Sequence, residues 1–200
     1  MKQLKEIDLF EAGAGVDSYL IKDAEDLMYL SKNSALWDKS FIYYLEANLN
    51  LQGYEFTPIG DASSLFKGFF EGNGCEIRNL TISLPQTQGV GLFGYVDENT
   101  EIESVILVNA NITGADGCGA VCGCNAGGKI RWCEVESSTI KGIDDMPQED
   151  LSIGICVGAN YDNGLVYGCI GNAKLITPYK EYETEEEEDI VGFNNANFVA

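Results

Sequence analysis

The sequence predicts an all-β solenoid, a parallel β-helix of about five coils with a short helix capping its N-terminal end. Three observations lead to this fold class. The chain repeats itself at nearly constant spacing. Its apolar residues alternate with polar ones in short segments bounded by glycine or asparagine. It contains 23 glycines but only 4 prolines. Short alternating segments are typical of half-buried strands, and abundant glycine with little proline favours many tight corners.

The internal repeat is clearest when residues 89–114 are placed beside residues 117–142, a segment of equal length. The alignment pairs apolar or glycine positions throughout: Ile102 with Ile130, Val105 with Cys133, Leu107 with Val135, Ile112 with Ile140, and Gly114 with Gly142. The glycine-centred first part of each copy needs a slip of one residue. A third copy covers 154–169, a partial fourth covers 190–194, and residues 77–82 resemble the second half of an earlier copy.

Such copies are expected to stack, because one coil of this size cannot bury its own apolar face. Equivalent residues of stacked parallel strands lie about 4.8 Å apart and form ladders. The alignment predicts two internal ladders, Phe93–Cys122–Val157–Val191 and Leu80–Val105–Cys133–Cys169.

The two ends differ from the repeats. Residues 1–42 form an N-terminal segment with the capping helix, whose start is indicated by Asp23 as N-cap and whose apolar contacts come from Leu27, Met28 and Leu30. Residues 43–177 form the coils. Residues 178–200 are expected to be an acidic loop followed by a final coil.

A family resemblance is carried by the segment 69–82, FFEGNGCEIRNLTI, followed by GLFG at 91–94. Together with the lead-in segments 24–27, 48–51 and 56–60, it resembles the GLUG-motif repeat proteins of bacteria and their mobile elements, over residues 19–169. The resemblance implies a right-handed parallel β-helix. Members are mostly long, exported, surface-associated proteins linked to adhesion or glycan binding. Cys75 stands where the family commonly has histidine.

Charge is the most unusual property of the composition. The chain has 12 basic and 32 acidic residues, a net charge of −20, and no histidine. Such a protein is expected to avoid nucleic acid and anionic membranes and to be attracted to basic surfaces. The N-terminus lacks the apolar stretch of a secretory signal, so the sequence predicts a cytoplasmic protein.

The cysteines raise the question of a zinc site. Cys118, Cys122, Cys124 and Cys133 are close in sequence, but three, one and eight residues separate them, and two of them align with hydrophobic residues in other copies. Structural zinc sites need four convergent ligands. Core packing of reduced, metal-free cysteines is therefore the favoured interpretation, with zinc as the alternative, and no cofactor is expected.

Carboxylates are also considered for catalysis. Acids are plentiful in the turns, but a glycosidase needs two of them at a defined separation in a cleft, and a short rod offers little concavity. The candidates are Asp61, Asp97, Glu98, Asp116, Asp144 and Asp145. The sequence therefore predicts no catalytic residue and a non-enzymatic protein.

The acidic run near the C-terminus is the predicted partner-binding site. Its residues are Glu181, Glu183, Glu185, Glu186, Glu187, Glu188 and Asp189, joined by the upstream acids Asp144, Asp145, Glu149 and Asp150. A solvated loop is the plainer alternative for such a run. The hypothesis is an intracellular protein that engages a basic surface, such as that of a nucleic-acid-binding protein. Its sharpest form is a nucleic-acid mimic, a phage-type inhibitor of a host defence protein comparable to anti-CRISPR proteins.

Two competing functions remain open at this stage. One is a surface or secreted adhesin or glycan-binding module of the GLUG family, for which Tyr43, Tyr44, Tyr54 and Tyr95 are the candidate groove aromatics. The other is a structural piece of a larger phage or cell-wall protein.

Overall fold

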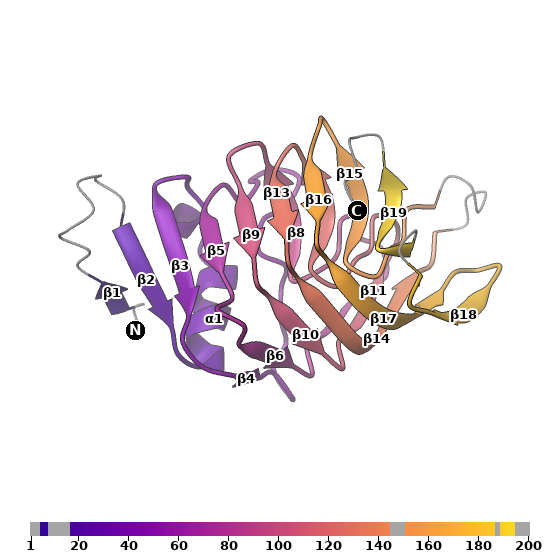
Figure 1. The fold of residues 1–200 in the computed structure, drawn as a ribbon, viewed down its shortest axis with the longest axis horizontal. Helices are drawn as coiled ribbons and strands as arrows, with labels where there is room; N and C mark the ends of the chain where they lie inside the picture. Colours follow the sequence, from indigo (N-terminus) through magenta and orange to yellow (C-terminus); the bar gives the residue numbers. More distant parts are fainter. Residues whose placement is uncertain (1–4, 8–16, 145–150, 187–188, 195–200) are drawn as a thin grey trace.

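In the computed structural model, the described part of the chain is built mostly of short β-strands (Figure 1), which form three sheets. The structure describes residues 5–7, 17–144, 151–186 and 189–194. All strand pairs are parallel except β1 with β2 and β17 with β18. The prediction of an all-β fold with parallel sheets is therefore confirmed.

The strands divide among the sheets as follows. Sheet A contains β1 (Lys5–Ile7), β2 (Asp17–Ile21), β3 (Phe41–Leu45), β5 (Phe69–Glu71), β9 (Glu101–Glu103), β13 (Lys129–Arg131) and β16 (Leu165–Tyr167). Sheet B contains β4 (Leu49–Asn50), β6 (Glu76–Arg78), β7 (Thr81–Leu84), β10 (Ile106–Val108), β11 (Asn111–Gly114), β14 (Glu134–Gly142), β17 (Ile170–Ile176) and β18 (Glu181–Thr184). Sheet C contains β8 (Phe93–Asp97), β12 (Cys122–Ala126), β15 (Val157–Tyr161) and β19 (Val191–Asn194).

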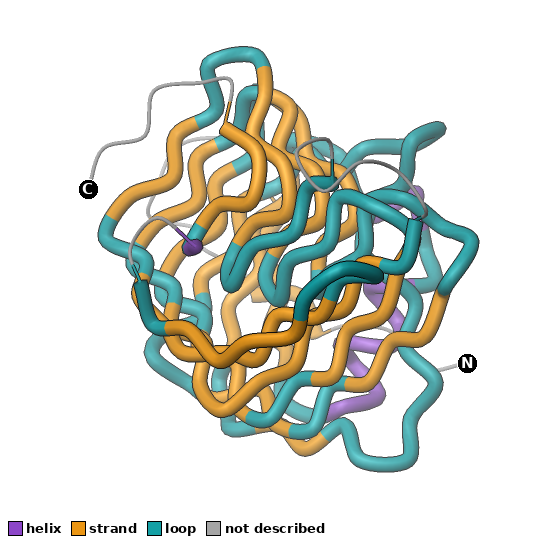
Figure 2. Tube along the Cα trace, turned by 90° about the vertical axis from the view of Figure 1, so that its right-hand side faces the viewer, coloured by secondary structure: helices purple, strands orange, loops and turns teal. Residues whose placement is uncertain are grey.

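The chain visits the three sheets in a fixed order. After a strand in sheet C it forms one in sheet A and then one or two in sheet B, so that β8, β9 and β10 are followed by β12, β13 and β14 and then by β15, β16 and β17. Figure 2 shows successive copies lying one beside the next, with the strands aligned. The apolar core lies between the sheets, where the rings of Phe66 and Phe93 lie 5.1 Å apart and those of Phe70 and Phe93 lie 5.3 Å apart.

The strand register agrees with the repeat alignment at most positions. Cys122 pairs with both Phe93 and Val157, and Val157 pairs with Val191, so the first predicted ladder is confirmed. The pairings of 102, 107, 112 and 114 with 130, 135, 140 and 142 are also present. Sheet C is offset by one residue relative to sheets A and B, as the slip in the alignment requires.

The second predicted ladder is wrong at one member. Glu76 pairs with Ile106, which sets Cys75 beside Val105, whereas Thr81 pairs with Asn111, which sets Leu80 beside Ala110. Cys75 therefore takes the position that was predicted for Leu80. The alignment matched apolar character, but the backbone hydrogen bonds decide which residues are neighbours. Among the other predicted members, Glu134 pairs with Ile170, which sets Cys133 beside Cys169.

The N-terminal helix begins where the sequence predicts. Helix α1 (Ala24–Ser31) has Asp23 as its N-cap, whose side chain accepts a hydrogen bond from the Asp26 N–H, and Leu27 and Leu30 are buried. A short 3₁₀ turn, η1 (Ser34–Leu36), follows. Strand β2 precedes the helix and pairs in parallel with β3, so sheet A begins before residue 43, the predicted start of the coils.

The acidic C-terminal segment differs from the predicted loop. Residues 181–184 form β18, which pairs antiparallel with the end of β17. The predicted final coil is described only as far as residue 194 and includes β19. Among the described residues, no helix is both long enough and apolar enough to cross a membrane.

Candidate functional site

Strand β18 positions the predicted acidic run at the edge of sheet B. Glu181, Glu183, Glu185 and Glu186 are all exposed to solvent. Asp189 is half-buried, and its Oδ2 accepts a hydrogen bond of 2.6 Å from the Thr184 hydroxyl, which indicates a structural part for that carboxylate. Glu187 and Glu188 lie outside the described residues.

The carboxylates of this run are not equally neutralised. Lys174 Nζ lies 2.5 Å from Glu181 Oε1, and this hydrogen bond, followed by the charges of Glu181 and Glu183, raises the pKa of the Lys174 ammonium. Within the described part of the chain, no lysine or arginine forms an ion pair with Glu183, Glu185 or Glu186. Glu183, on β18 itself, still faces Lys174 across the strands, so the described carboxylates with neither an ion pair nor a basic cross-strand partner are Glu185 and Glu186, directly after β18.

A shallow hollow brings the run next to strand β17. It is lined by Asn172, Glu183, Thr184, Glu185 and Glu186, with a volume of about 320 Å³. The Asn172 side-chain oxygen accepts a hydrogen bond from the backbone N–H of Ser137 on β14, 2.8 Å away. This contact joins the acidic run to the middle strands of sheet B.

Strand β14 adds a second pair of acids to this face. Glu134 and Glu136 are partly exposed, and burial, then the nearby charge of Glu136, raises the pKa of the Glu134 carboxyl. Glu134 lies beside Ile170 on β17. We call the face formed by Glu134, Glu136, Asn172, Glu183, Glu185 and Glu186 the sheet B acidic surface.

The upstream acids of the predicted site do not join this surface in the described structure. Asp144 lines a separate pocket, and Asp145, Glu149 and Asp150 lie outside the described residues. The sequence analysis grouped these acids with the C-terminal run because of their charge. Charge in the sequence does not show which residues are close in space.

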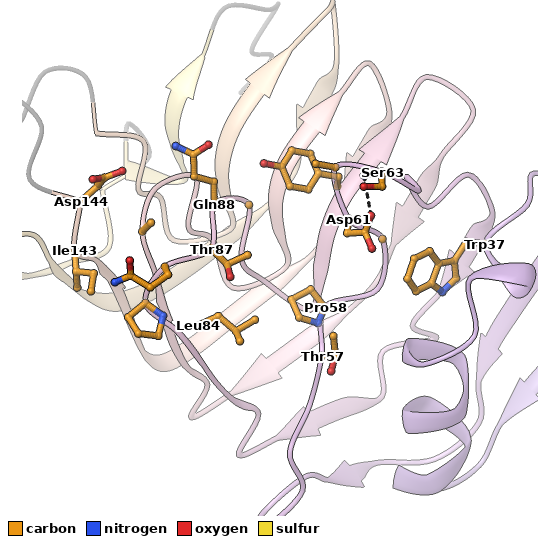
Figure 3. A pocket seen from close by; sticks show the side chains of 17 residues that line it. Trp37, Thr57, Pro58, Asp61, Ser63, Leu84, Thr87, Gln88, Ile143 and Asp144 are labelled. Atoms are coloured by element: carbon orange, nitrogen blue, oxygen red, sulfur yellow. Dashed lines mark hydrogen bonds between the residues drawn. The ribbon is translucent and has the colours of Figure 1, made fainter.

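The pocket that contains Asp144 is the larger hollow, with a volume of about 770 Å³ (Figure 3). Polar uncharged groups, including Thr57, Thr87 and Gln88, make up much of its lining, and Asp61 and Asp144 are its two carboxylates. The Asp61 carboxylate already accepts hydrogen bonds from the backbone N–H groups of Ser63 and Ser64. The arrangement fits a neutral, polar ligand better than a cation.

The four tyrosines that the sequence suggested for a glycan-binding groove do not gather in the pocket that contains Asp144. Tyr43 is fully buried and donates a hydrogen bond to the Leu36 carbonyl, and Tyr54 lies outside the pocket lining, as does Tyr44. Tyr95 does line the pocket, and burial raises the pKa of its hydroxyl. Trp37, which the sequence reasoning missed, lines it too, but only 7% of this residue is exposed and its indole N–H donates to the Leu30 carbonyl.

Five of the seven cysteines are buried in the core, and Cys75 and Cys169 are half-buried against it. All seven are free thiols, and burial raises the pKa of Cys118 to about 12 and that of Cys124 to about 11. Cys122 occupies the ladder position of Phe93 and Val157. In the described residues, no group of three or more histidine, cysteine or acidic side chains is arranged to hold a metal ion.

A cluster around Trp132 was missed by the sequence reasoning. More than half of Trp132 is exposed (55%), its ring lies edge-on to that of Tyr167 at 5.7 Å, and the Arg131 guanidinium carbon lies 5.1 Å from its centroid. The repeat held a signal, because the positions equivalent to Trp132 carry Gly72, Ser104 and Gly168, none of them large or apolar.

Comparison with known proteins gives partial matches. The chain is 31% identical over 160 residues to Halomucin of Haloquadratum walsbyi, which covers 73% of this chain and 2% of that protein. It is 34% identical over 83 residues to a protein of Evansella cellulosilytica described as a Gly-rich membrane protein, covering 42% of this chain and 10% of the other. The chain therefore spans a small part of the length of these relatives.

No protein-family model matches the chain. Among solved structures, a Bacteroides ovatus protein described as an immunoglobulin A1 protease superposes with a TM-score of 0.59. The match covers 90% of this chain and 63% of the other, at 14% sequence identity. At that identity the similarity concerns the fold alone.

Proposed function

We propose that the chain is a right-handed parallel β-helix of the GLUG-motif type and acts as a non-catalytic binding module for a basic protein surface. The fold is supported by the fixed order in which the chain visits three parallel sheets and by the registers that repeat from copy to copy. Stacked coils of this kind form a rigid rod, because each copy packs between its neighbours. Helix α1 caps its N-terminal end.

The observation that carries the function is the exposed run of Glu183, Glu185 and Glu186. In the described structure Glu185 and Glu186 have no ion pair, and Glu183 faces Lys174 across the strands, a lysine already bound to Glu181. The acids lie on and directly after a strand that is hydrogen-bonded to β17, so ordering them on binding costs less than it would in a free loop. Because one surface ion pair contributes only about 0–1 kcal/mol, several acids must act together. The net charge of −20 adds long-range attraction to a basic partner.

The sharpest form of the proposal is mimicry of nucleic acid. Proteins that bind nucleic acid present lysine and arginine to a dense row of phosphates, and a rigid row of carboxylates can occupy the same surface. The partner would be a nucleic-acid-binding protein, and the chain a cytoplasmic inhibitor of the phage or anti-CRISPR type. This form rests on charge and shape.

The test compares two variants of equal charge change. Glu183→Gln, Glu185→Gln and Glu186→Gln are combined in one variant, and Glu46→Gln, Glu55→Gln and Glu98→Gln, which are exposed elsewhere, are combined in the control. Immobilised core histones serve as the basic probe. We expect the first variant to slow association by about tenfold and the control by less than about twofold, with both differences shrinking in high salt.

An equal effect of the two variants would show that net charge alone drives the binding, and the proposed site would be wrong. Failure of the histones to release bound duplex DNA when the wild-type chain is added would remove the mimicry form.

A second candidate function is a surface or secreted adhesin or glycan-binding module. It is favoured by the polar, largely uncharged pocket of Figure 3 and by the similarity to Halomucin and to a protein described as a membrane protein. Calorimetric titration with neutral oligosaccharides tests it. Binding that is lost when Thr87 and Gln88 are changed to alanine would support this function, and no heat with any oligosaccharide would reject it.

A further inference from the structure

Trp132 has a backbone conformation that its side chain does not favour. Its φ is +52°, in the left-handed region, at the turn between β13 and β14. The equivalent positions of the two adjacent copies carry Ser104 and Gly168, with φ of 55° and 61°. Glycine adopts this region freely and asparagine tolerates it, but a bulky residue there is strained. The turn therefore does not explain why a tryptophan stands at this position.

The indole of Trp132 is exposed and yet held in place. A Cβ atom at Gly168 would lie 2.5 Å from Trp132 Cδ1, so the ring packs directly against the backbone of the next turn. The Tyr167 ring and the Arg131 guanidinium contact it from β16 and β13. An exposed aromatic ring that is fixed before binding loses little conformational freedom when a partner contacts it.

The charge around the ring is negative once the ion pairs are counted. Arg131 is bound by Glu103 and Glu101, and it donates a further hydrogen bond of 3.0 Å to the Tyr167 hydroxyl. Glu134, two residues after Trp132, forms with Glu136 a carboxyl pair to which no ion pair is assigned in the described structure. Ile170, beside Glu134, is 60% exposed.

We propose that Trp132, with Glu134, Glu136 and Ile170, is the anchor point at which an arginine or lysine side chain of a basic partner binds. The stem of such a side chain packs on Ile170 and the indole, and its cationic head reaches the two carboxylates. Tryptophan in a preformed site is the residue type most often found to dominate interface energetics. This inference rests on the proposed function and names where on the sheet B acidic surface the strongest contact lies.

The anchor point is continuous with the rest of that surface. Glu136 lies next to Ser137, which is hydrogen-bonded to Asn172, and Asn172 lines the hollow with Glu183, Glu185 and Glu186. A basic partner can therefore contact the anchor and the acidic run at once. The two parts should contribute differently, the acids to association and the anchor to dissociation.

The test uses Trp132→Asn, because asparagine tolerates a left-handed backbone, as Asn109 does with φ of 55°, and the fold should be kept. The matched control is Tyr54→Asn, which removes another exposed aromatic ring on a different part of the chain. With histones as the probe, we expect Trp132→Asn to speed dissociation by tenfold or more, while Tyr54→Asn leaves it unchanged. Urea denaturation should show no loss of stability for Trp132→Asn.

Fluorescence gives a second readout, because the chain has two tryptophans and the other, Trp37, is buried. Adding histones should change the wild-type emission and leave that of Trp132→Phe unchanged. If Glu183→Gln, Glu185→Gln and Glu186→Gln slow association but Trp132→Asn leaves dissociation unaltered, the anchor is wrong and the proposed function stands.

If wild-type chain does not bind histones at all, both proposals fall. An emission change with neutral oligosaccharides and none with histones would overturn the anchor proposal and assign the ring to a sugar.

Discussion

The middle of the stack and its C-terminal end use the same repeat for different purposes. In the middle, Phe66, Phe70 and Phe93 are fully buried, and their rings pack against one another between the sheets. Among the residues that the structure describes, four of the five exposed large hydrophobic side chains fall instead within residues 132–193: Trp132, Ile170, Tyr179 and Phe193. Inward-facing positions of the repeat are buried, whereas corner and outward-facing positions such as Trp132 and Ile170 leave apolar side chains available for contact.

The largest expected effect is on the free energy of unfolding. It comes from making the same substitution, phenylalanine to alanine, in the middle of the stack and at its end. Phe93→Ala should lower the free energy of unfolding by about 3–5 kcal/mol, because it leaves a cavity between the rings of Phe66 and Phe70. Phe193→Ala, at a residue that is 39% exposed, should cost less than about 1 kcal/mol. Urea denaturation measures both, and equal losses would mean that the end is packed as tightly as the middle.

A smaller effect is expected at two glycines with nearly the same backbone conformation. Gly53 and Gly60 have φ of 84° and 82°, so alanine is strained at both by about 1–2 kcal/mol. A Cβ at Gly60 would lie 2.3 Å from the Tyr95 carbonyl oxygen, whereas nothing lies within 4 Å at Gly53.

We therefore expect Gly60→Ala to cost a further 1–3 kcal/mol or so in the unfolding free energy, because the backbone of the adjacent copy must shift. Thermal or urea unfolding of both variants decides the point. Similar losses of unfolding free energy in the two variants would show that backbone strain at the glycine matters more than the contact with the adjacent copy.

The smallest effect concerns two acids that meet across sheet A. Glu71 pairs in register with Glu103, and burial, followed by a hydrogen bond with Glu103, raises the pKa of the Glu71 carboxyl. A raised pKa in the folded state means that stability falls as pH rises through the interval between the unfolded and folded pKa values. Glu71→Gln should thus be more stable than wild type at pH 7 by up to about 1 kcal/mol.

This advantage should shrink below about pH 4 and disappear near pH 3, where the wild-type carboxyl is protonated in both states. The amide oxygen can keep the hydrogen bond that Glu71 Oε1 accepts from the Asn73 N–H, so the variant removes charge with little else. Denaturation curves at the highest and the lowest of these pH values provide the measurement. A constant difference between the proteins would exclude repulsion between Glu71 and Glu103 as its cause.

Much of the fold could be predicted from the sequence because the repeat is local and periodic. Alternation sets which side chains face inward, and the ladder through Phe93, Cys122, Val157 and Val191 follows from it. The N-cap at Asp23 was predicted for the same reason, since its signal lies within one turn of the helix. The error at Leu80 arose because the alignment matched apolar character alone: the register sets Leu80 beside Ala110 and Cys75 beside Val105, both thirty residues apart.

The candidate site was less accessible to sequence reasoning. Charge density pointed to the acidic run, but the run could not show that Glu181 would pair with Lys174 or that Asp144 would lie in a different pocket. The sequence by itself determined the repeated copies and the acidic run, because both are patterns of residues that are close together along the chain. Only the tertiary structure decided that β18 pairs antiparallel with β17 and that Trp132 packs on Gly168 with its ring exposed. Those contacts join residues far apart in sequence, and their energies depend on distances in space.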